Sequence, residues 1–350
     1  MIEQPDNSAS AQSWPARPGG AQSGAAQSRA AQSSEPLANG EQSNMALSEH
    51  DVDHTVLSMR DVRKSFGALN VLDGLSLAVH PGEVFGFLGR NGAGKSTAIR
   101  ILMGITKADS GQIHVFQKPL RSDVIAIRQR IGYVAQEQNM YPWMTPKVLS
   151  KFVRGFYPRW DEQRFQSLIN DFQLPLKRRI GTFSGGMKAK LSLSVALSTR
   201  PELLVLDEPT AGMDPVARRE FLDLVREQTM RDGATTFFST HLVDEIEAVA
   251  DRIGIVESGR TIYDGELDPL RNSIASWSIS MNEYTPGSMP GVFAQDRLRI
   301  LSEGERQGRW VVTLQFPQEA LASNEIVLDV GWRHDAMSLE DVFIAVVANS

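Results

Sequence analysis

The sequence contains no cysteine among its 350 residues, which excludes disulfides, thiolate metal sites and cysteine nucleophiles. It also has no apolar run close to the roughly 20 residues that a membrane-spanning helix needs. The first residues, Met1–Pro5, show neither the basic segment nor the apolar core of a secretory signal. We therefore expect a protein of a reducing, cytosolic compartment.

Strong charge of one sign is missing from most of the chain. The formal net charge is -6, but residues 1–54 alone hold seven acidic and two basic side chains, so the remainder is close to neutral. A neutral body gives no electrostatic reason to expect a nucleic-acid partner, because such partners are held by clustered Lys and Arg. The one dense basic run, Lys177–Arg179, is more typical of a solvated loop face.

Large apolar side chains are scarce in the first 44 residues, which are rich in Ala, Gln, Ser and Gly. The tripeptide Ala-Gln-Ser recurs there at 11–13, 21–23, 26–28 and 31–33. Such a composition cannot offset the entropy lost on ordering, so residues 1–54 are predicted to form a disordered tail. A linker and a translation start at Met45 both stay open as explanations.

From Thr55 onward, short apolar runs alternate with longer amphipathic stretches, which favours an α/β fold with parallel strands. Between residues 137 and 200 no strong strand pattern occurs, which predicts a helical subdomain. Strands are predicted at Val56–Met59, Leu75–Val79, Val84–Leu88, Ile113–Phe116, Ile131–Val134, Leu203–Leu206, Thr235–Ser239, Ile253–Val256 and Thr261–Tyr263.

Residues 271–350 show a different pattern and carry no motif with assignable chemistry. Strands are predicted at Trp277–Met281, Trp310–Phe316 and Ile326–Val330, and a closing helix at Leu339–Val347. We expect a small β-rich accessory domain, whose role in dimer contact, regulation or contact with another subunit is open.

A phosphate-binding motif follows the apolar strand Val84–Leu88. The pattern Gly-x-x-x-x-Gly-Lys-Ser runs from Gly89 to Ser96 and precedes the helical stretch Ala98–Met103, which is the context that a P-loop requires. Its glycines let backbone N–H groups turn toward a triphosphate at a helix N-terminus. The predicted ATP-binding residues are Gly89, Arg90, Asn91, Gly92, Ala93, Gly94, Lys95, Ser96 and Thr97, with Lys95 on the β- and γ-phosphates and Ser96 on Mg²⁺.

A second anchor for the metal ion is predicted in Leu203–Pro209. Asp207 ends an apolar strand, and the carboxyl ends of parallel strands face the ligand crevice of an open sheet. Asp207 is therefore a predicted Mg²⁺ ligand, and Glu208 the predicted general base for the attacking water. A guanine-reading pattern at Thr106–Asp109 lies only eleven residues past Lys95, too early for that role, so a GTPase is not expected.

Taken together, these motifs resemble those of the ATP-binding subunits of ABC transporters, over roughly Val56 to Leu270. The resemblance implies a P-loop NTPase core with an antiparallel β part over residues 55–270 and an inserted helical subdomain. It aligns Phe66 with the aromatic that stacks on adenine and Gln136 with the glutamine that touches Mg²⁺ and the water. It aligns His241 with the histidine near the γ-phosphate.

The stretch Phe183–Lys190, FSGGMKAK, places a second anion-binding turn before a predicted helix, Met187–Thr199. In the resembled family this signature contacts the ATP that is held by a partner subunit. The resemblance therefore implies a dimer, with itself or a paralogous subunit, in which Ser184, Gly185, Gly186 and Met187 bind ATP in trans. Asp214 corresponds to the D-loop aspartate.

The finer resemblance is to the branch that serves ABC-2-type exporters, because Met187 stands where glutamine is commoner and Ser338–Phe343 reads SLEDVF. Arg90 departs from the family's usual proline without removing a catalytic group. The resemblance implies a separate transmembrane permease subunit and a place on the cytoplasmic face of the membrane. Met140, Tyr141, Trp143 and Met144 either pack the helical subdomain or line a groove for that permease.

The competing hypothesis is an ABC-type ATPase that acts on ribosomes or nucleic acid. The ribosomal type usually has two nucleotide domains in one chain, and the DNA-repair types have long coiled coils or zinc cysteines. This chain has one P-loop, no heptad run and no cysteine. A non-catalytic binding module is disfavoured because Glu208 and His241 are both present.

Overall fold

The computed structural model describes residues 54–285, 290, 298–316 and 331–349. All of them fall in the second of the two units into which the chain divides, Ala46–Ser350. The tail that was predicted to be disordered lies outside the described residues, apart from His54. In the described part of the chain no helix is both long enough and apolar enough to cross a membrane.

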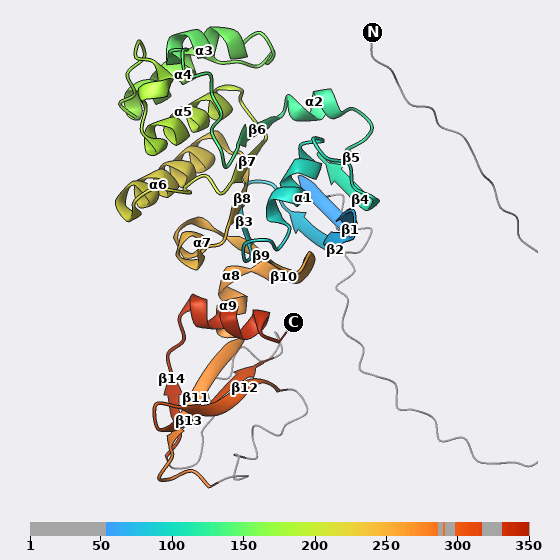
Figure 1. The fold of residues 1–350 in the computed structure, drawn as a ribbon, viewed down its shortest axis with the longest axis vertical. Coiled ribbons are helices and arrows are strands. Elements are labelled where there is room, and N and C mark those ends of the chain that lie inside the picture. The colour runs from blue at the N-terminus through green and yellow to red at the C-terminus, as the bar shows by residue number, and fades with distance from the viewer. Residues whose placement is uncertain (1–53, 286–289, 291–297, 317–330, 350) are drawn as a thin grey trace, which may run out of the picture. The chain divides into compact units, whose positions relative to one another are not determined.

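The core is a six-stranded sheet in the order β10-β9-β3-β8-β7-β6, in which only β10 runs antiparallel to its neighbour (Figure 1). Every residue of β3, β7 and β8 is buried, as expected of parallel strands covered on both faces. The predicted strands match β3, β6, β7, β8 and β9 to within one residue at each end, whereas the prediction for β10, Thr261–Tyr263, ends three residues too early. The strands are β3 (Val84–Leu88), β6 (Ile131–Val134), β7 (Leu203–Asp207), β8 (Thr235–Thr240), β9 (Arg252–Glu257) and β10 (Arg260–Glu266).

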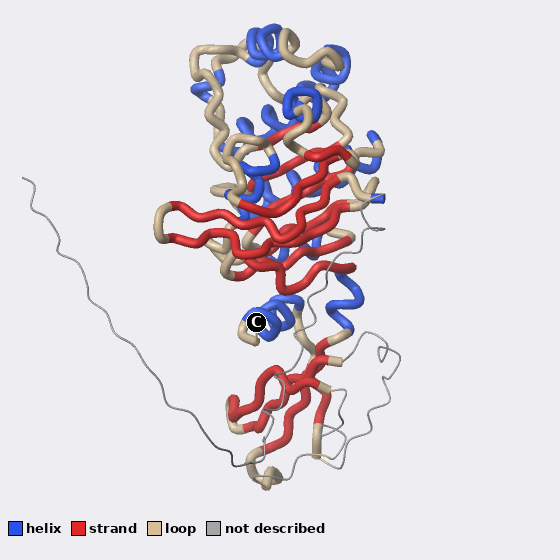
Figure 2. Tube along the Cα trace, turned by 90° about the vertical axis from the view of Figure 1, so that its right-hand side faces the viewer, coloured by secondary structure: helices blue, strands red, loops and turns tan. Residues whose placement is uncertain are grey.

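A second, antiparallel sheet has the order β2-β1-β4-β5. It comprises β1 (Leu57–Phe66), β2 (Leu69–Val79), β4 (Ser110–Val115) and β5 (Lys118–Pro119). The two sheets are joined where β2 lies beside β10, since the N–H of Ser76 donates to Thr261 Oγ1 at 3.2 Å and that of Ala78 to Asp264 Oδ2 at 2.9 Å. In Figure 2 the strands of the two sheets, drawn in red, lie next to one another.

Helices cover the sheets and fill the block that was predicted to be helical. They are α1 (Lys95–Leu102), α2 (Val124–Arg128), α3 (Pro146–Val153), α4 (Glu162–Asp171), the 3₁₀ turn η2 (Ile180–Thr182), α5 (Gly185–Ser198), α6 (Pro215–Asp232), α7 (Val243–Val249), α8 (Leu267–Asn272) and α9 (Leu339–Val347). In Figure 1, α3, α4 and α5 gather beyond β6 and β7. They share one apolar cluster, to which α4 gives Phe165 and α5 gives Leu191. The short helix α2 was not predicted.

The C-terminal region contains a third sheet in the order β12-β13-β11-β14, all antiparallel. Its strands are β11 (Ile274–Ser280), β12 (Arg299–Arg306), β13 (Arg309–Gln315) and β14 (Arg333–Asp335). Helix α9 begins at a capping box on Ser338, and its Leu339 and Val342 lie in the same apolar cluster as Ile246 of α7. The predicted strand Ile326–Val330 lies outside the described residues.

Candidate functional site

The loop between β3 and α1 needs its glycines for two separate reasons. Gly92 and Gly94 have φ of 86° and 105°, which L side chains rarely adopt. A Cβ on Gly89 would lie 2.5 Å from the carbonyl oxygen of Val256, and one on Gly94 would lie 2.6 Å from Leu72 Cδ2. The loop therefore presses against β2 and β9 and delivers its backbone to the N-terminus of α1, where a phosphate is stabilised by free N–H groups.

The Lys95 side chain is 3% exposed and turns back across this loop. Its Nζ donates to the carbonyl oxygens of Gly89 at 2.8 Å and Arg90 at 3.2 Å. The same atom lies 3.2 Å from Glu208 Oε1. A buried ammonium is thus held at the centre of the loop, facing the end of β7.

The carboxylate of Glu208 is the point at which the predicted catalytic residues meet. Its Oε2 lies 3.2 Å from His241 Nδ1 and accepts a hydrogen bond of 3.4 Å from Gln136 Nε2. These residues follow the carboxyl ends of β7, β8 and β6, which are neighbours in the sheet. The sheet order therefore brings together side chains that are 72 positions apart in the chain.

Asp207 lies beside this cluster and is bonded to two hydroxyl groups. Its Oδ1 accepts from Ser239 Oγ at 3.0 Å and from Ser96 Oγ at 3.3 Å. Burial raises the pKa of Asp207, and the two serine hydroxyls oppose that shift because they bond to the charged form. The structure thus places the two predicted metal ligands, Ser96 and Asp207, in contact. Ser239 was missed by the sequence reasoning, although it lies two residues before His241.

The remaining predicted site residues lie outside this cluster. Phe66 ends β1 with 51% of its surface exposed and the Lys64 ammonium 5.1 Å from its ring centre. Ser184 Oγ accepts from Met187 N at 3.2 Å and caps α5, while the Met187 side chain packs on the apolar cluster. Asp214 caps α6 through the N–H groups of Val216 and Ala217. These contacts are local, and among the described residues no hydrogen bond or ion pair joins Ser184 or Asp214 to the Lys95–Glu208 cluster.

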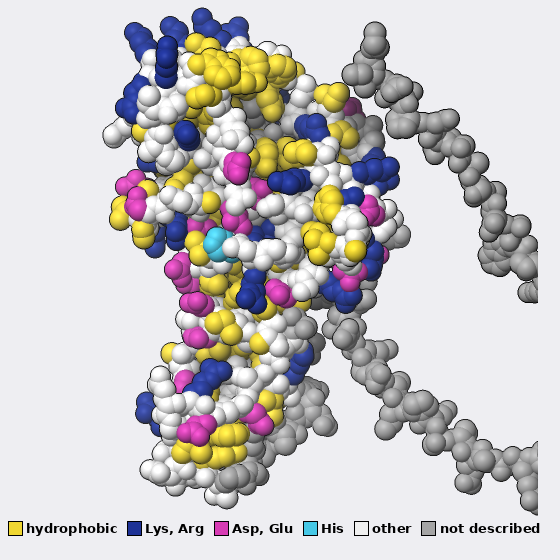
Figure 3. All heavy atoms as spheres, viewed as in Figure 1, with side chains coloured by type: hydrophobic (Ala, Val, Ile, Leu, Met, Phe, Trp, Pro, Cys, Tyr) yellow, Lys and Arg dark blue, Asp and Glu magenta, His cyan; other side chains and the backbone are white. Residues whose placement is uncertain are grey.

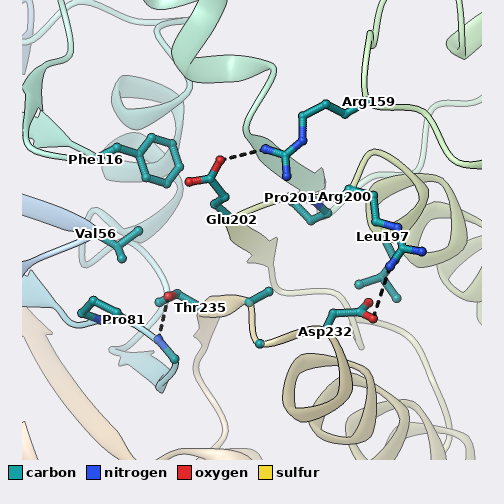
Figure 4. A pocket seen from close by; sticks show the side chains of 13 residues that line it. Val56, Pro81, Phe116, Arg159, Leu197, Arg200, Pro201, Glu202, Asp232 and Thr235 are labelled. Carbon is teal, nitrogen blue, oxygen red and sulfur yellow. Dashed lines mark hydrogen bonds and ion pairs between the residues drawn. The ribbon is translucent and has the colours of Figure 1, made fainter.

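Two cavities show where a ligand has room. One, of about 540 Å³, is lined by Arg90, Asn91, Gly92, Ala93, His241, Glu257 and Ser258, and so opens on the P-loop. The other, of about 330 Å³, lies at the amino-terminal ends of β7 and β8 (Figure 4). Its charged groups already face one another, since Glu202 pairs with Arg159 and Asp232 with Arg200. Only the first cavity adjoins the predicted chemistry.

Comparison with known proteins identifies the family. The family model described as ABC transporter matches residues 72–211. The chain is 40% identical to the Nod factor export ATP-binding protein I of Rhizobium etli over 71% of this chain and 81% of that protein. It is 34% identical to the bacitracin transport ATP-binding protein of Bacillus licheniformis, over 62% and 72% respectively. A solved ATP-binding subunit of an ABC transporter superposes with a TM-score of 0.57 and 30% identity, over 62% of this chain and 92% of that one.

The chain therefore belongs to the ATP-binding subunits of ABC transporters and has the P-loop NTPase fold. Membership of this family carries ATP binding, ATP hydrolysis coupled to transport and a membrane permease as partner. The resemblance that the motifs indicated is confirmed at this level. The roles of single residues and the domain boundaries stay predictions.

Proposed function

We propose that this chain hydrolyses ATP as the energy-coupling subunit of an exporter, working as a dimer on a separate permease at the cytoplasmic face of the membrane. The direction of transport is supported by relatives named for Nod factor export and bacitracin transport. The single observation that carries hydrolysis is the carboxylate of Glu208, which contacts Lys95, Gln136 and His241 together.

The residues present suit a magnesium–triphosphate complex. Ser96 and Asp207 place two oxygen ligands side by side at the mouth of the loop, and oxygen is the donor that Mg²⁺ prefers. Gln136 lies close enough to the same carboxylate cluster to serve as a third. Ser96 and Asp207 would hold the ion, which would supply positive charge to offset the negative charge that develops on the phosphates.

The proton-transfer roles follow from the same contacts. Glu208 accepts a proton from the attacking water. Its Oε2 contacts the amide of Gln136 and the ring of His241, and we expect these two side chains to orient that water. Lys95, released from Glu208 toward the phosphates, stabilises the transferred charge. His241 donates to a γ-phosphate oxygen.

The dimer is supported by the two glycines of the signature. A Cβ added to Gly185 or Gly186 would meet nothing within 4 Å, and neither residue has a positive φ. The chain's own packing and backbone conformation therefore give no reason for glycine at these positions. Close approach of a phosphate held by another subunit would explain these glycines, because the N-terminus of α5 would then face the phosphate without an intervening side chain.

Docking of the permease is supported by four exposed aromatic side chains, Tyr141, Trp143, Phe152 and Phe156, here called the aromatic patch. Their rings touch in series, with centroids 5.0, 6.0 and 5.2 Å apart. Figure 3 shows apolar side chains gathered at the end of the molecule where Figure 1 places α3, beside Lys and Arg side chains. Exposed aromatic clusters of this kind mark protein interaction sites.

The sequence left open whether the loop 140–144 packs the helical subdomain or forms a docking surface, and the side chains divide between the two. Met140 and Met144 pack on the apolar cluster, whereas Tyr141 and Trp143 are exposed. The two methionines therefore anchor the loop on the helical subdomain, and the two aromatic side chains form an apolar outer surface. Action on ribosomes or nucleic acid is the alternative, and the near-neutral net charge of the chain outside residues 1–54 gives it no electrostatic support.

The hydrolytic role is tested with Glu208→Gln. The amide keeps the size of the side chain but cannot take a proton, so kcat should fall about 100-fold or more while ATP affinity changes by about threefold at most. ATPase rate and ATP binding are measured on the purified chain. Glu220→Gln, an exposed change on α6, is the matched control. Equal rates for Glu208→Gln and the wild type would contradict the proposal.

A further inference from the structure

A second glutamate near the nucleotide site is buried and has no role in the chemistry described above. Glu245 lies on α7, four residues after His241, and its surface is 1% exposed. Each of its carboxylate oxygens accepts a hydrogen bond from a threonine hydroxyl. Thr210 Oγ1 donates to Oε1 at 2.5 Å and Thr240 Oγ1 donates to Oε2 at 2.5 Å. A buried carboxylate is stable only when it is paired and bonded in this way.

The two threonines belong to the two segments that carry the catalytic side chains. Thr210 lies two residues after Glu208, and Thr240 directly precedes His241. Both are buried. The carboxylate of Glu245 therefore joins the turn after β7 to the last residue of β8.

The Glu208 turn needs such a tie because its backbone is strained. Glu208 has φ of 42°, a conformation that costs a side-chain-bearing residue about 1–3 kcal/mol and persists only where surrounding contacts enforce it. The N–H of Glu208 donates to Ser239 O at 3.1 Å, and the N–H of Ala211 donates to Glu208 O at 3.1 Å, which closes a turn that includes Thr210. The bond from Thr210 to Glu245 fixes the far side of that turn.

The same carboxylate also reaches the segment that follows the D-loop. Arg218 of α6 places Nε 3.4 Å from Glu245 Oε1, as an ion pair without an aligned hydrogen bond. Asp214 caps the same helix one turn earlier. The Thr240 hydroxyl, which donates to Glu245, also accepts from the N–H of Leu242 at 3.0 Å. One charged group thus contacts the segments after Glu208, before His241 and after Asp214.

We propose that Glu245 is a positioning residue for ATP hydrolysis, which holds Glu208 and His241 in register by accepting from Thr210 and Thr240 and pairing with Arg218. Its side-chain contacts are with Thr210, Thr240 and Arg218, and we assign it no direct contact with the reacting atoms. The inference rests on the proposed role of Glu208 in hydrolysis. Its loss should slow the chemical step and leave nucleotide binding nearly intact, since the P-loop contacts of Lys95 do not involve it.

The test compares Glu245→Gln with Glu247→Gln on the same helix, where Glu247 is exposed and pairs with Arg271. The amide of Glu245→Gln can accept only one of the two hydroxyls and no longer pairs with Arg218. We expect kcat to fall about 10- to 100-fold, because misplacing a catalytic group by about 1 Å costs about 100-fold. The Kd for ATP should change by about twofold at most. Glu247→Gln should match the wild type in both.

Isosteric changes of the threonines separate positioning from general stability. Thr210→Val and Thr240→Val each remove one hydroxyl at constant shape, and both should lower kcat, whereas Thr210→Ser and Thr240→Ser should restore it. Combined with Glu245→Gln, each valine variant should lower kcat by less than the product of the single effects, because the residues act as one unit. These variants decide the question if Glu245→Gln does not fold.

The inference is overturned if the valine variants hydrolyse ATP at the wild-type rate, or if Glu245→Gln lowers only the melting temperature. Failure of the proposed function would look different, because Glu208→Gln would then retain the wild-type rate whatever the Glu245 variants do.

Discussion

Glu83 is a carboxylic acid in surroundings that oppose its ionisation. It precedes β3, where its Oε1 accepts from His80 N at 2.8 Å and its Oε2 lies 3.6 Å from Arg252 Nε. Burial, together with smaller contributions from Asp264 and Asp251, raises the pKa of Glu83 to about 7 against the opposing effects of His80 and Arg252. The folded protein therefore keeps this proton at a pH where the unfolded chain has lost it.

The contribution of Glu83 to the free energy of unfolding should therefore decrease as pH rises. The contribution of Glu83 is fully present below its unfolded pKa of 4.5 and is lost as pH rises through about 7. Glu83→Gln keeps the acceptor for His80 and cannot ionise, so its free energy of unfolding relative to the wild type should increase by about 2 kcal/mol between pH 4.5 and pH 8. Urea denaturation at both pH values measures this. A difference that does not change with pH would contradict the raised pKa.

At the scale of single residues, the sequence could predict a role only where the residues that act together lie close to one another in the chain. Residue type and spacing alone pointed to Lys95 and Ser96 after β3, and to Asp207 and Glu208 at the end of β7. They did not point to Glu245, because its bond to Thr210 spans 35 positions and no spacing rule connects the two. Burial is the property that distinguishes Glu245 from Glu247, and burial depends on how α7 packs.

The aromatic patch is formed by α3 and by the segments directly before and after it. Trp143 is 65% exposed and its ring contacts that of Tyr141 at a tilt of 43°, so replacing it with alanine removes apolar contact area without opening a cavity in the core. We expect Trp143→Ala to lose about 2 kcal/mol or more of permease affinity, as for a central interface aromatic. ATPase of the isolated chain should stay within about twofold of the wild type. Co-purification with the permease and transport in membranes measure the coupling.

Ile125→Ala supplies the control, because Ile125 is 72% exposed on α2 and lies outside the patch. It should leave permease binding unchanged. The docking role would be refuted if Trp143→Ala reduced the ATPase of the isolated chain as much as it reduced transport.

Secondary structure was predictable where an element is buried along its whole length. The apolar runs of β3, β6 and β7 gave nearly the correct bounds, since burial on both faces demands them. In β1 and β2 only the buried portions were recognised, because the outer residues of β1 are largely exposed and polar. Strand β12 was missed altogether, since most of Arg299–Arg306 is exposed and half of its residues are charged. Pairing with β13, which apolar periodicity does not encode, holds it in the sheet.

Two turns of the molecule are predicted to bind phosphate, and no hydrogen bond or ion pair of the described residues joins one to the other. The P-loop is pressed between β2 and β9, so its glycines are explained within the chain. Gly185 and Gly186 at the start of α5 have open space around them, so their explanation lies outside it. The sequence could suggest this division only by resemblance, whereas the surroundings of the glycines support it on physical grounds.

A second subunit should therefore be needed for the ATP-bound state. In Glu208→Gln, where hydrolysis is blocked, ATP should convert the chain to a dimer that size-exclusion chromatography with light scattering detects. Adding Gly185→Asp should abolish that dimer, because a carboxylate would face the partner's γ-phosphate, while ATP binding to the monomer stays within about threefold, since the change meets nothing in its own chain. Gly155→Asp, a change at another exposed glycine without positive φ, should leave the dimer intact. If Glu208→Gln stayed monomeric in ATP, or if the dimer survived Gly185→Asp, the α5 turn would have no role in trans.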